Sequence, residues 1–351
     1  MINPLSIPLY FLVFIVAFCS SFLLTPLLIV IAKHLKILDI PSESHKAHDK
    51  PIPYLGGLAI LVPFLLALFT YLLHFESGPG VKEQIISLGL SAFCISSIGL
   101  IDDVKLISAR IKLALQLTIS TPMVLFLIES GFAVQLSGIK LLDVLLSLMW
   151  LVAIINCINF VDNIDGGAAG LVLISCIPIL TLSIIGGQFL ISTLSLFIAA
   201  STAAFLFWNL SPARIYLGDS GSLFLGLLMG ILTLSLDSQT GSRTTSLLTP
   251  ILILGLPIVD ALVAIFGRLY RREPIMLGNR DHLSHRLIGK GCSKQKSVTI
   301  LWCLQALSSS LAIVINVTTS LGVLRILEFT SCVYLGLVTV FFLRHSPQSP
   351  V

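Results

Sequence analysis

The chain has 351 residues, of which 56% are hydrophobic and 11% are charged, and its formal net charge is +4. A mean hydropathy of +1.02 leaves too little polar side chain to cover a water-soluble globule. The composition therefore excludes a soluble protein, and the small charge excess fits the loops of a membrane protein. The seven cysteines form no CxxC pair, so neither disulfides nor a thiolate metal site is expected.

Apolar stretches of about 20 residues recur along the chain and predict membrane-spanning helices joined by short connectors. We expect about eleven spans, at residues 7–32, 53–74, 84–101, 111–128, 141–158, 167–186, 189–208, 221–236, 247–267, 298–318 and 320–343. The first stretch is too long for a cleavable signal and is interpreted as a span. The predicted fold class is all-α, a polytopic helical bundle, and residues 1–351 are expected to form a single integral membrane domain.

Lysine and arginine concentrate on alternate connectors, which the positive-inside rule assigns to the cytoplasm. These connectors carry Lys33, Lys36, Lys46, Lys50, Lys105, Arg110, Lys112, Arg214 and a basic cluster within residues 268–296. The opposite side holds only Lys82, Lys140, Arg243 and Arg325. With eleven spans, the N-terminus lies outside and the C-terminus in the cytoplasm. The predicted location is the cell (inner) membrane, with several passes.

The same parity places five polar segments together on the cytoplasmic face. They are residues 33–52, 102–112, 156–167, 209–220 and 268–297. Asp102 and Asp103 are adjacent carboxylates at a membrane boundary, where they repel each other unless a cation or water compensates them. A solvated start of a loop is the alternative interpretation of this pair.

A second polar group follows an apolar helix, in which Asn156, Asn159, Asp162 and Asp165 recur at every third residue. On a helix this spacing keeps the four side chains near one face. Carboxylate and amide oxygens are the ligands that Mg²⁺ prefers, and the following glycines let backbone approach a bulky anion. A polar helix end with a glycine exit is the alternative.

The sequence Gly218-Asp219-Ser220-Gly221 stands directly before another span. Amide groups at a helix N-terminus form an anion site, and Asp219 is a candidate ligand of Mg²⁺. Alternatively, Asp219 and Ser220 only cap the helix.

The segment 268–297 is rich in arginine and histidine, and we expect Arg280, Arg286, His282 and His285 to contact phosphate. The two histidines are one helical turn apart, so a metal pair is conceivable. Phosphate contact is favoured because the carboxylates elsewhere already provide a site for a hard metal and no HExxH motif is present. Three further arginines are interpreted as topology anchors or contacts to lipid headgroups: Arg268, Arg271 and Arg272.

Acidic groups for Mg²⁺ and basic groups for phosphate, on the side where nucleotides are found, indicate phosphoryl transfer. A multi-span transporter or channel is the distant alternative, and a channel needs acidic rings but no loop rich in arginine and histidine. Asp260, an intramembrane carboxylate and therefore a functional candidate, is expected to brace an Arg or Lys of the neighbouring loop.

Taken together, these segments resemble the polyprenyl-phosphate N-acetylhexosamine-1-phosphate transferases, glycosyltransferase family 4. In the first connector, DIPSESHKAHDKPIPYLGG is similar to the family pattern DxPxxRKxHxxxxPxxGG, with Lys46 and His48 matching and His45 where Arg is usual. The histidine segment HLSH, with Ser284 in its middle, is closer to the HxHH pattern of the WecA-like GlcNAc-1-phosphate transferases. The PxHHHxE pattern of the phospho-MurNAc-pentapeptide transferases is less similar.

The resemblance, together with the residues themselves, implies roles for each candidate. The catalytic candidates are Asp102, Asp103, Asp162, Asp165, His282 and His285. Asp219 and Asn159 are expected to hold Mg²⁺, with Mn²⁺ as a substitute. The substrate-binding candidates are Lys46, His48, Lys112, Asn156, Asn209, Tyr216, Arg280 and Arg286, with Tyr216 matching an aromatic residue that stacks on uracil in the family.

The implied reaction moves N-acetylhexosamine 1-phosphate, most simply GlcNAc 1-phosphate, from a UDP-sugar to undecaprenyl (polyprenyl) phosphate. It yields the lipid-pyrophosphate-sugar and UMP, as the first membrane step of cell-envelope glycan synthesis, such as that of lipopolysaccharide. A phospho-MurNAc-pentapeptide transferase of peptidoglycan synthesis is the alternative. The expected partners are these two substrates, membrane lipid and, as one option, a second copy of the chain in a homodimer; no nucleic acid is expected.

Overall fold

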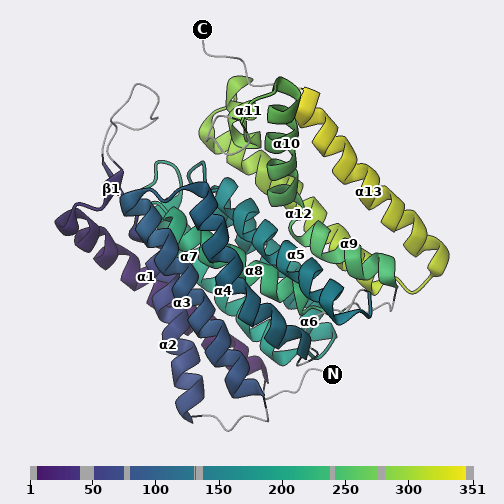
Figure 1. Ribbon diagram of the computed structural model, residues 1–351, viewed down its shortest axis with the longest axis horizontal. Helices are drawn as coiled ribbons and strands as arrows, with labels where there is room; N and C mark the ends of the chain where they lie inside the picture. Colours follow the sequence, from purple (N-terminus) through teal and green to yellow (C-terminus); the bar gives the residue numbers. More distant parts are fainter. Residues whose placement is uncertain are drawn as a thin grey trace.

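The computed structural model describes residues 6–39, 51–74, 80–129, 131, 137–237, 242–274 and 281–344. Within these ranges the chain forms thirteen α-helices and one antiparallel pair of two-residue strands, β1 (Leu38–Asp39) and β2 (Ile52–Pro53). A short 3-10 helix, η1 (Leu55–Gly57), follows β2. The prediction of a polytopic all-α membrane protein is confirmed (Figure 1).

The helices follow one another along the whole described chain. They are α1 (Ser6–Leu35), α2 (Leu58–His74), α3 (Val81–Lys105), α4 (Ala109–Glu129), α5 (Lys140–Phe160), α6 (Gly167–Ile185), α7 (Phe189–Asn209), α8 (Gly218–Leu234), α9 (Arg243–Ile253), α10 (Gly255–Arg271), α11 (Leu283–Gly289), α12 (Lys294–Val317) and α13 (Leu321–Arg344).

The expected spans all fall on helices, but one of them is not continuous. Nine helices of the described ranges are long and apolar enough to cross a membrane, and α8 is a shorter apolar helix. The ninth expected span, 247–267, consists of α9 and α10, which are bent by 78° relative to each other. The expectation of one straight helix there is therefore wrong.

The break between α9 and α10 has a local cause. Pro257 lacks an N–H and cannot bond the carbonyl of Ile253, so a continuous helix is interrupted. Gln305 of α12 takes up the freed backbone groups. Its Nε2 donates to Ile253 O at 2.8 Å, and its Oε1 accepts from Leu256 N at 2.9 Å. A broken helix is tolerated in a membrane when its backbone groups find such partners.

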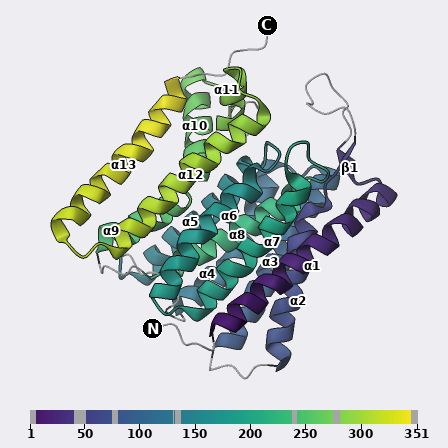
Figure 2. The ribbon, with the colours of Figure 1, turned by 180° about the vertical axis from the view of Figure 1, so that it is seen from behind.

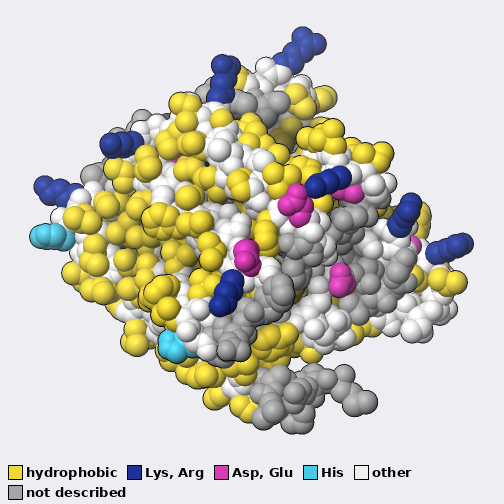
Figure 3. Space-filling view, turned by 60° about the horizontal axis from the view of Figure 1, so that its bottom comes forward, with side chains coloured by type: hydrophobic (Ala, Val, Ile, Leu, Met, Phe, Trp, Pro, Cys, Tyr) yellow, Lys and Arg dark blue, Asp and Glu magenta, His cyan; other side chains and the backbone are white. Residues whose placement is uncertain are grey.

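Helix α8 is the centre of the bundle and packs between α3 and α5 (Figure 1). Small residues permit close contact: a Cβ at Gly226 would lie 2.6 Å from the Cα of Ile155. On the other side α1 packs on α7, and α9 to α13 form a separate group that contacts the bundle mainly through α12 and α6 (Figure 2). The outer surface is dominated by hydrophobic side chains, as contact with lipid requires (Figure 3).

Candidate active site

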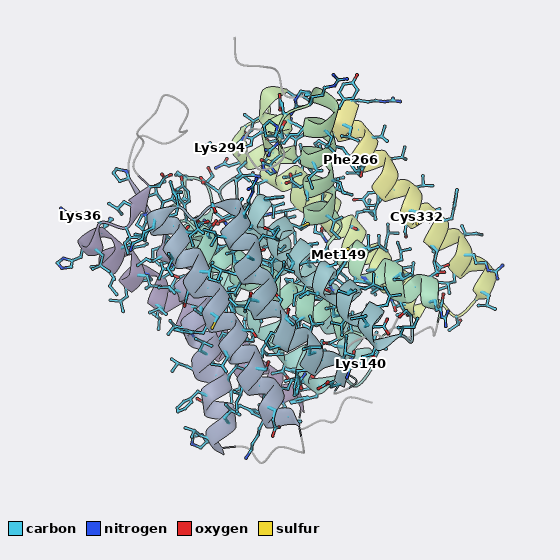
Figure 4. All side chains as sticks on the ribbon, in the orientation of Figure 1. Lys36, Lys140, Met149, Phe266, Lys294 and Cys332 are labelled. Carbon is cyan, nitrogen blue, oxygen red and sulfur yellow. The ribbon has the colours of Figure 1, made fainter. Side chains whose placement is uncertain are left out.

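The connector between α7 and α8, residues 210–217, joins several of the polar segments at one end of the bundle. Tyr216 N donates to Pro53 O at 2.8 Å, which ties the connector to β2. Gln295 Nε2 at the start of α12 donates to Ser211 O at 3.1 Å. In Figure 4 the side chain of Lys294 lies at this end of the molecule, and that of Lys140 lies at the opposite end.

An acidic cluster is built where α3, α4, α5 and α8 meet. Lys112 Nζ donates to Asp102 Oδ2 at 2.8 Å and also to Asp219 Oδ2. Asn159 Nδ2 donates to the other oxygen of Asp219 at 2.7 Å. The side chains of Lys112 and Asp102 are only 15% and 11% exposed, whereas Asp219 is 27% exposed. One ammonium group therefore compensates two carboxylates, and the carboxylate of Asp219 remains the more accessible of the two.

The first turn of α8 is held by carboxylates from other parts of the chain. Asp103 accepts hydrogen bonds from Asp219 N at 2.9 Å and from Ser220 N at 3.2 Å. The carboxylate of Asp162 accepts from Gly218 N. In this structure side chains of the protein occupy these amides, so the expectation that the amides form a site for a substrate anion is wrong. Asp103 is a positioning group for the helix that carries Asp219.

Two glycines allow this close approach to α8. A Cβ at Gly99 of α3 would lie 2.3 Å from Asp219 O, and one at Gly57 of η1 would lie 2.2 Å from Gly221 N. Real Cβ atoms do not tolerate such distances, so any larger residue would push α3 or η1 away from α8. The position of Asp219 relative to Asp102 thus depends on backbone contact.

The polar residues after α5 do not all lie on a helix. Because α5 ends at Phe160, Asn156 and Asn159 lie on it, whereas Asp162 and Asp165 lie in the turn that follows. The expectation that all four line one helix face is therefore wrong beyond Asn159.

Two amide side chains predicted to bind substrate are engaged inside the protein. Asn156 Nδ2 donates to Gln116 Oε1 at 2.7 Å. Asn209, only 2% exposed, accepts from Gly166 N at 3.0 Å and donates to Ile215 O at 2.9 Å. The two bonds of Asn209 hold the turn after α5 against the connector before α8, and they favour a positioning role for Asn209.

The turn between α5 and α6 also carries Asp162, whose pKa is shifted by its surroundings. Burial and the neighbouring carboxylates raise the pKa of Asp162 well above its ordinary value. Asp165 Oδ2 accepts from Ala213 N at 3.2 Å. Beside them, the rings of Tyr54 and Tyr216 lie 5.9 Å apart at 47°, and burial raises the pKa of both phenols.

The histidine segment folds back onto α10. His282 Nδ1 lies 2.6 Å from Asp260 Oδ2, and Leu283 N donates to Asp260 Oδ1 at 2.7 Å. Asp260 thus braces a histidine, and the expectation of an Arg or Lys partner is wrong. The rings of His282 and His285 lie 6.5 Å apart. In the described part of the chain, no three His, Cys, Asp or Glu side chains could by themselves hold a metal ion.

A buried ion pair supports this segment. Asp281, 1% exposed, accepts from Arg268 Nε at 2.8 Å and from Arg271. Burial alone would raise the pKa of Asp281, but the two guanidinium groups lower it below its ordinary value. Arg268 is therefore not a surface anchor as expected. Arg286, also buried, donates to Asp281 O and to Phe342 O, both at 2.8 Å.

Three predicted substrate contacts lie outside the described residues: Lys46, His48 and Arg280.

A helical membrane bundle that gathers carboxylates, a lysine and a carboxylate-bound histidine at one end has the groups required of a phosphotransferase. The family model described as glycosyl transferase family 4 matches residues 85–237, which include the acidic cluster. The chain is 35% identical over 311 residues to a probable undecaprenyl-phosphate N-acetylglucosaminyl 1-phosphate transferase of Bacillus subtilis, covering 87% of this chain and 85% of the relative. This chain belongs to glycosyl transferase family 4 and to its WecA-like members.

Two further relatives support the same family. An undecaprenyl-phosphate alpha-N-acetylglucosaminyl 1-phosphate transferase of Thermotoga maritima is 30% identical over 282 residues, or 80% of this chain and 82% of the relative. A phospho-N-acetylmuramoyl-pentapeptide-transferase of Staphylococcus aureus is 24% identical over 332 residues, or 86% of this chain and 98% of that protein.

Proposed function

We propose that this protein transfers GlcNAc 1-phosphate from UDP-GlcNAc to undecaprenyl phosphate, forming the lipid-pyrophosphate-sugar and UMP. The observation that carries the proposal is the cluster in which Lys112 lies between the carboxylates of Asp102 and Asp219. The names of the relatives in Bacillus and Thermotoga support the acceptor and the sugar. The distribution of lysine and arginine supports a cytoplasmic site in the inner membrane.

The residues of the acidic cluster fit a Mg²⁺ ion. The carboxylates of Asp102 and Asp219 outnumber the ammonium group of Lys112, and they present hard oxygen donors. Mg²⁺ in such sites uses one or two carboxylates and completes its shell with water and substrate phosphates, so three protein acids are not required. Asp219 and Asn159 would hold the ion, since rotation of the Asn159 amide presents its oxygen. The bound ion would neutralise the diphosphate and stabilise the leaving UMP.

The acceptor needs little help to become nucleophilic. A phosphate monoester has a second pKa of about 6, so the lipid phosphate is largely a dianion at neutral pH. In the proposed reaction one of its oxygens attacks the β-phosphorus of UDP-GlcNAc directly, in line with the UMP that leaves. Asp102, fixed by Lys112 at 2.8 Å, orients the reactants and does not need to remove a proton. Detection of a phospho-aspartyl enzyme would favour double displacement instead.

The decisive experiment measures UMP released from UDP-GlcNAc by the purified full chain, with and without undecaprenyl phosphate and Mg²⁺. Asp219→Ala is the test variant, and Asp237→Ala, exposed beyond the far end of α8, is the matched control. Release that requires both additions and survives only in the control variant supports the proposal.

Other outcomes separate the alternatives. Release from UDP-MurNAc-pentapeptide but not from UDP-GlcNAc would keep the chemistry and change the donor. Absence of release with every UDP-sugar would overturn the transferase proposal and favour the transporter or channel.

A further inference from the structure

Asp260 and His282 meet although they are 22 residues apart in the sequence. After the bend between α9 and α10, helix α10 packs against α5, and α11 lies next to α10 in Figure 1. Asp260 is 2% exposed, and both of its oxygens are engaged: Oδ2 with His282 Nδ1 at 2.6 Å and Oδ1 with Leu283 N at 2.7 Å.

A structural need alone does not explain a carboxylate at this position. A carboxylate within a membrane helix is costly, and a neutral Asn could accept the hydrogen bond from Leu283 N equally well. Unlike the amide of Asn, a carboxylate at this position offers only an acceptor to His282, so that His282 donates from Nδ1. With the Nδ1 proton held in this way, Nε2 is left for another partner.

The ring of His282 also has an aromatic neighbour, and its segment has a second side-chain hydrogen bond. The centroid of the His282 ring lies 5.7 Å from that of Phe160, the last residue of α5. Ser284 Oγ donates to Asn163 Oδ1 at 2.5 Å, which ties α11 to the turn that contains Asp162. The ring of His282 therefore lies beside Phe160, the last residue of α5, which follows Asn159, the partner of Asp219, in the sequence.

We propose that Asp260 is a positioning residue of the transfer reaction: it holds His282 in one orientation and one tautomer, with Nε2 directed to the transferred phosphate. This inference rests on the proposed function, because the partner of Nε2 is the diphosphate of the UDP-sugar. Asp260 itself touches neither substrate. Its effect passes entirely through the ring of His282.

Asp260→Asn is the discriminating variant. It keeps the size of the side chain and an acceptor for Leu283 N, but its amide donates to Nδ1 and stabilises the opposite tautomer. We expect kcat to fall about 10- to 100-fold, the loss typical of a residue that orients a reactive histidine through a hydrogen bond. We expect KM for UDP-GlcNAc to change by less than about threefold, because ground-state binding is retained.

A double-mutant cycle separates positioning from a general loss of structure. In the His282→Gln background, Asp260→Asn should lower kcat by less than about twofold, since the ring on which it acts is gone. Asp260→Glu restores the carboxylate and should recover part of the rate lost in Asp260→Asn. Equal losses in both backgrounds, or an Asp260→Asn enzyme as fast as the wild type, would overturn the inference.

The tautomer can also be measured without turnover, by NMR of the full chain in detergent with ¹⁵N-labelled histidine, assigned by the His282→Gln variant. A proton on Nδ1 in the wild type that moves to Nε2 in Asp260→Asn supports the role of Asp260. A wild-type proton on Nε2 overturns it. If the wild type releases no UMP from any UDP-sugar but carries the His282 proton on Nδ1, the result would count against the proposed function only.

Discussion

Two polar regions lie at the same end of the bundle, and they differ in how their charges are balanced. In the acidic region of α3, α4 and α8, the carboxylates of Asp102 and Asp219 share the single ammonium group of Lys112. In the histidine region of α10 and α11, Asp281 faces two guanidinium groups and Asp260 faces an imidazole. The acidic region keeps more carboxylate than ammonium charge, which suits the proposed Mg²⁺, whereas the histidine region is balanced internally and uses its charges to fix a geometry.

The largest expected effect is on stability, in the histidine region. Arg268→Met leaves the buried Asp281 with only the guanidinium of Arg271, which is the more exposed of the two arginines. Removal of one partner of a buried ion pair costs about 3 kcal/mol or more. Unfolding in detergent measures the loss. Arg271→Met is the control, because Arg271 is 27% exposed and Asp281 keeps its bond to Arg268 at 2.8 Å. Equal losses from both variants would show that this ion pair is not the support of α11.

The next effect is on rate, in the acidic region. Lys112→Met leaves Asp102 and Asp219 close together without their shared cation, and the transfer rate should fall about 100-fold or more, as when a preorganised charge is removed from a reacting phosphate. UMP release measures the rate. Lys105→Met is the control, because Lys105 is exposed at the end of α3. A Lys112→Met enzyme that keeps its rate would make Lys112 a structural group like Arg268.

The backbone contact beneath the acidic cluster offers a third test. Gly99→Ala should destabilise the protein by about 1–3 kcal/mol and lower the rate, because its Cβ forces α3 away from the first turn of α8. Gly89→Ala in the same helix is a matched control, since its Cβ would lie 3.5 Å from the nearest side-chain atom, an ordinary contact. Similar results for both variants would show that general packing of α3, and not its contact with Asp219, sets the rate.

A fourth effect concerns pH. Because the pKa of Asp162 is raised, its neutral form is favoured in the folded protein. The stability that this group contributes is complete below its ordinary value of 3.8 and is lost as pH rises through the raised value. Asp162→Asn should remove this decline and, above that window, stabilise the protein by about 1 kcal/mol. Unfolding temperatures over a pH series measure the stability of the wild type and of Asp162→Asn. If the two stabilities change with pH in parallel, the raised pKa of Asp162 would be contradicted. If Asp162 is catalytic, the more stable variant is also the slower enzyme.

The sequence predicted what depends on local composition. The apolar stretches became helical, although the stretch 247–267 forms the bent pair α9 and α10. The acidic pair, the Asn159 region and Asp219 could be assigned to one face because connector charge alternates along the chain. The break at Pro257 was not predicted, since the apolar run continues through it and the compensating Gln305 lies in another helix.

Contacts between distant segments could not be predicted from the sequence either. Nothing in the local pattern around Asp260 indicates that its partner is His282, because only tertiary packing brings the two residues together. The burial of Asn209 and the occupation of the α8 amides by Asp103 depend equally on tertiary packing. The sequence thus identified residue types suited to the chemistry and did not separate those that face a substrate from those that hold other residues.

The smallest expected effect lies at the hydrogen bond between Ser284 of α11 and Asn163 in the turn that follows α5. Ser284→Ala removes the bond to Asn163, and a single hydrogen bond contributes about 0.5–1.5 kcal/mol, or roughly a 2- to 13-fold change in rate if the bond is needed in the transition state. We expect the lower end, because the bond between Asp260 and His282 still holds the ring. Combining Ser284→Ala with Asp260→Asn should therefore reduce the rate by more than the product of the single losses, because each bond compensates for the loss of the other. Simple multiplication would mean that Ser284 supports α11 without restraining its histidine, and the histidine region would then depend on Asp260 alone.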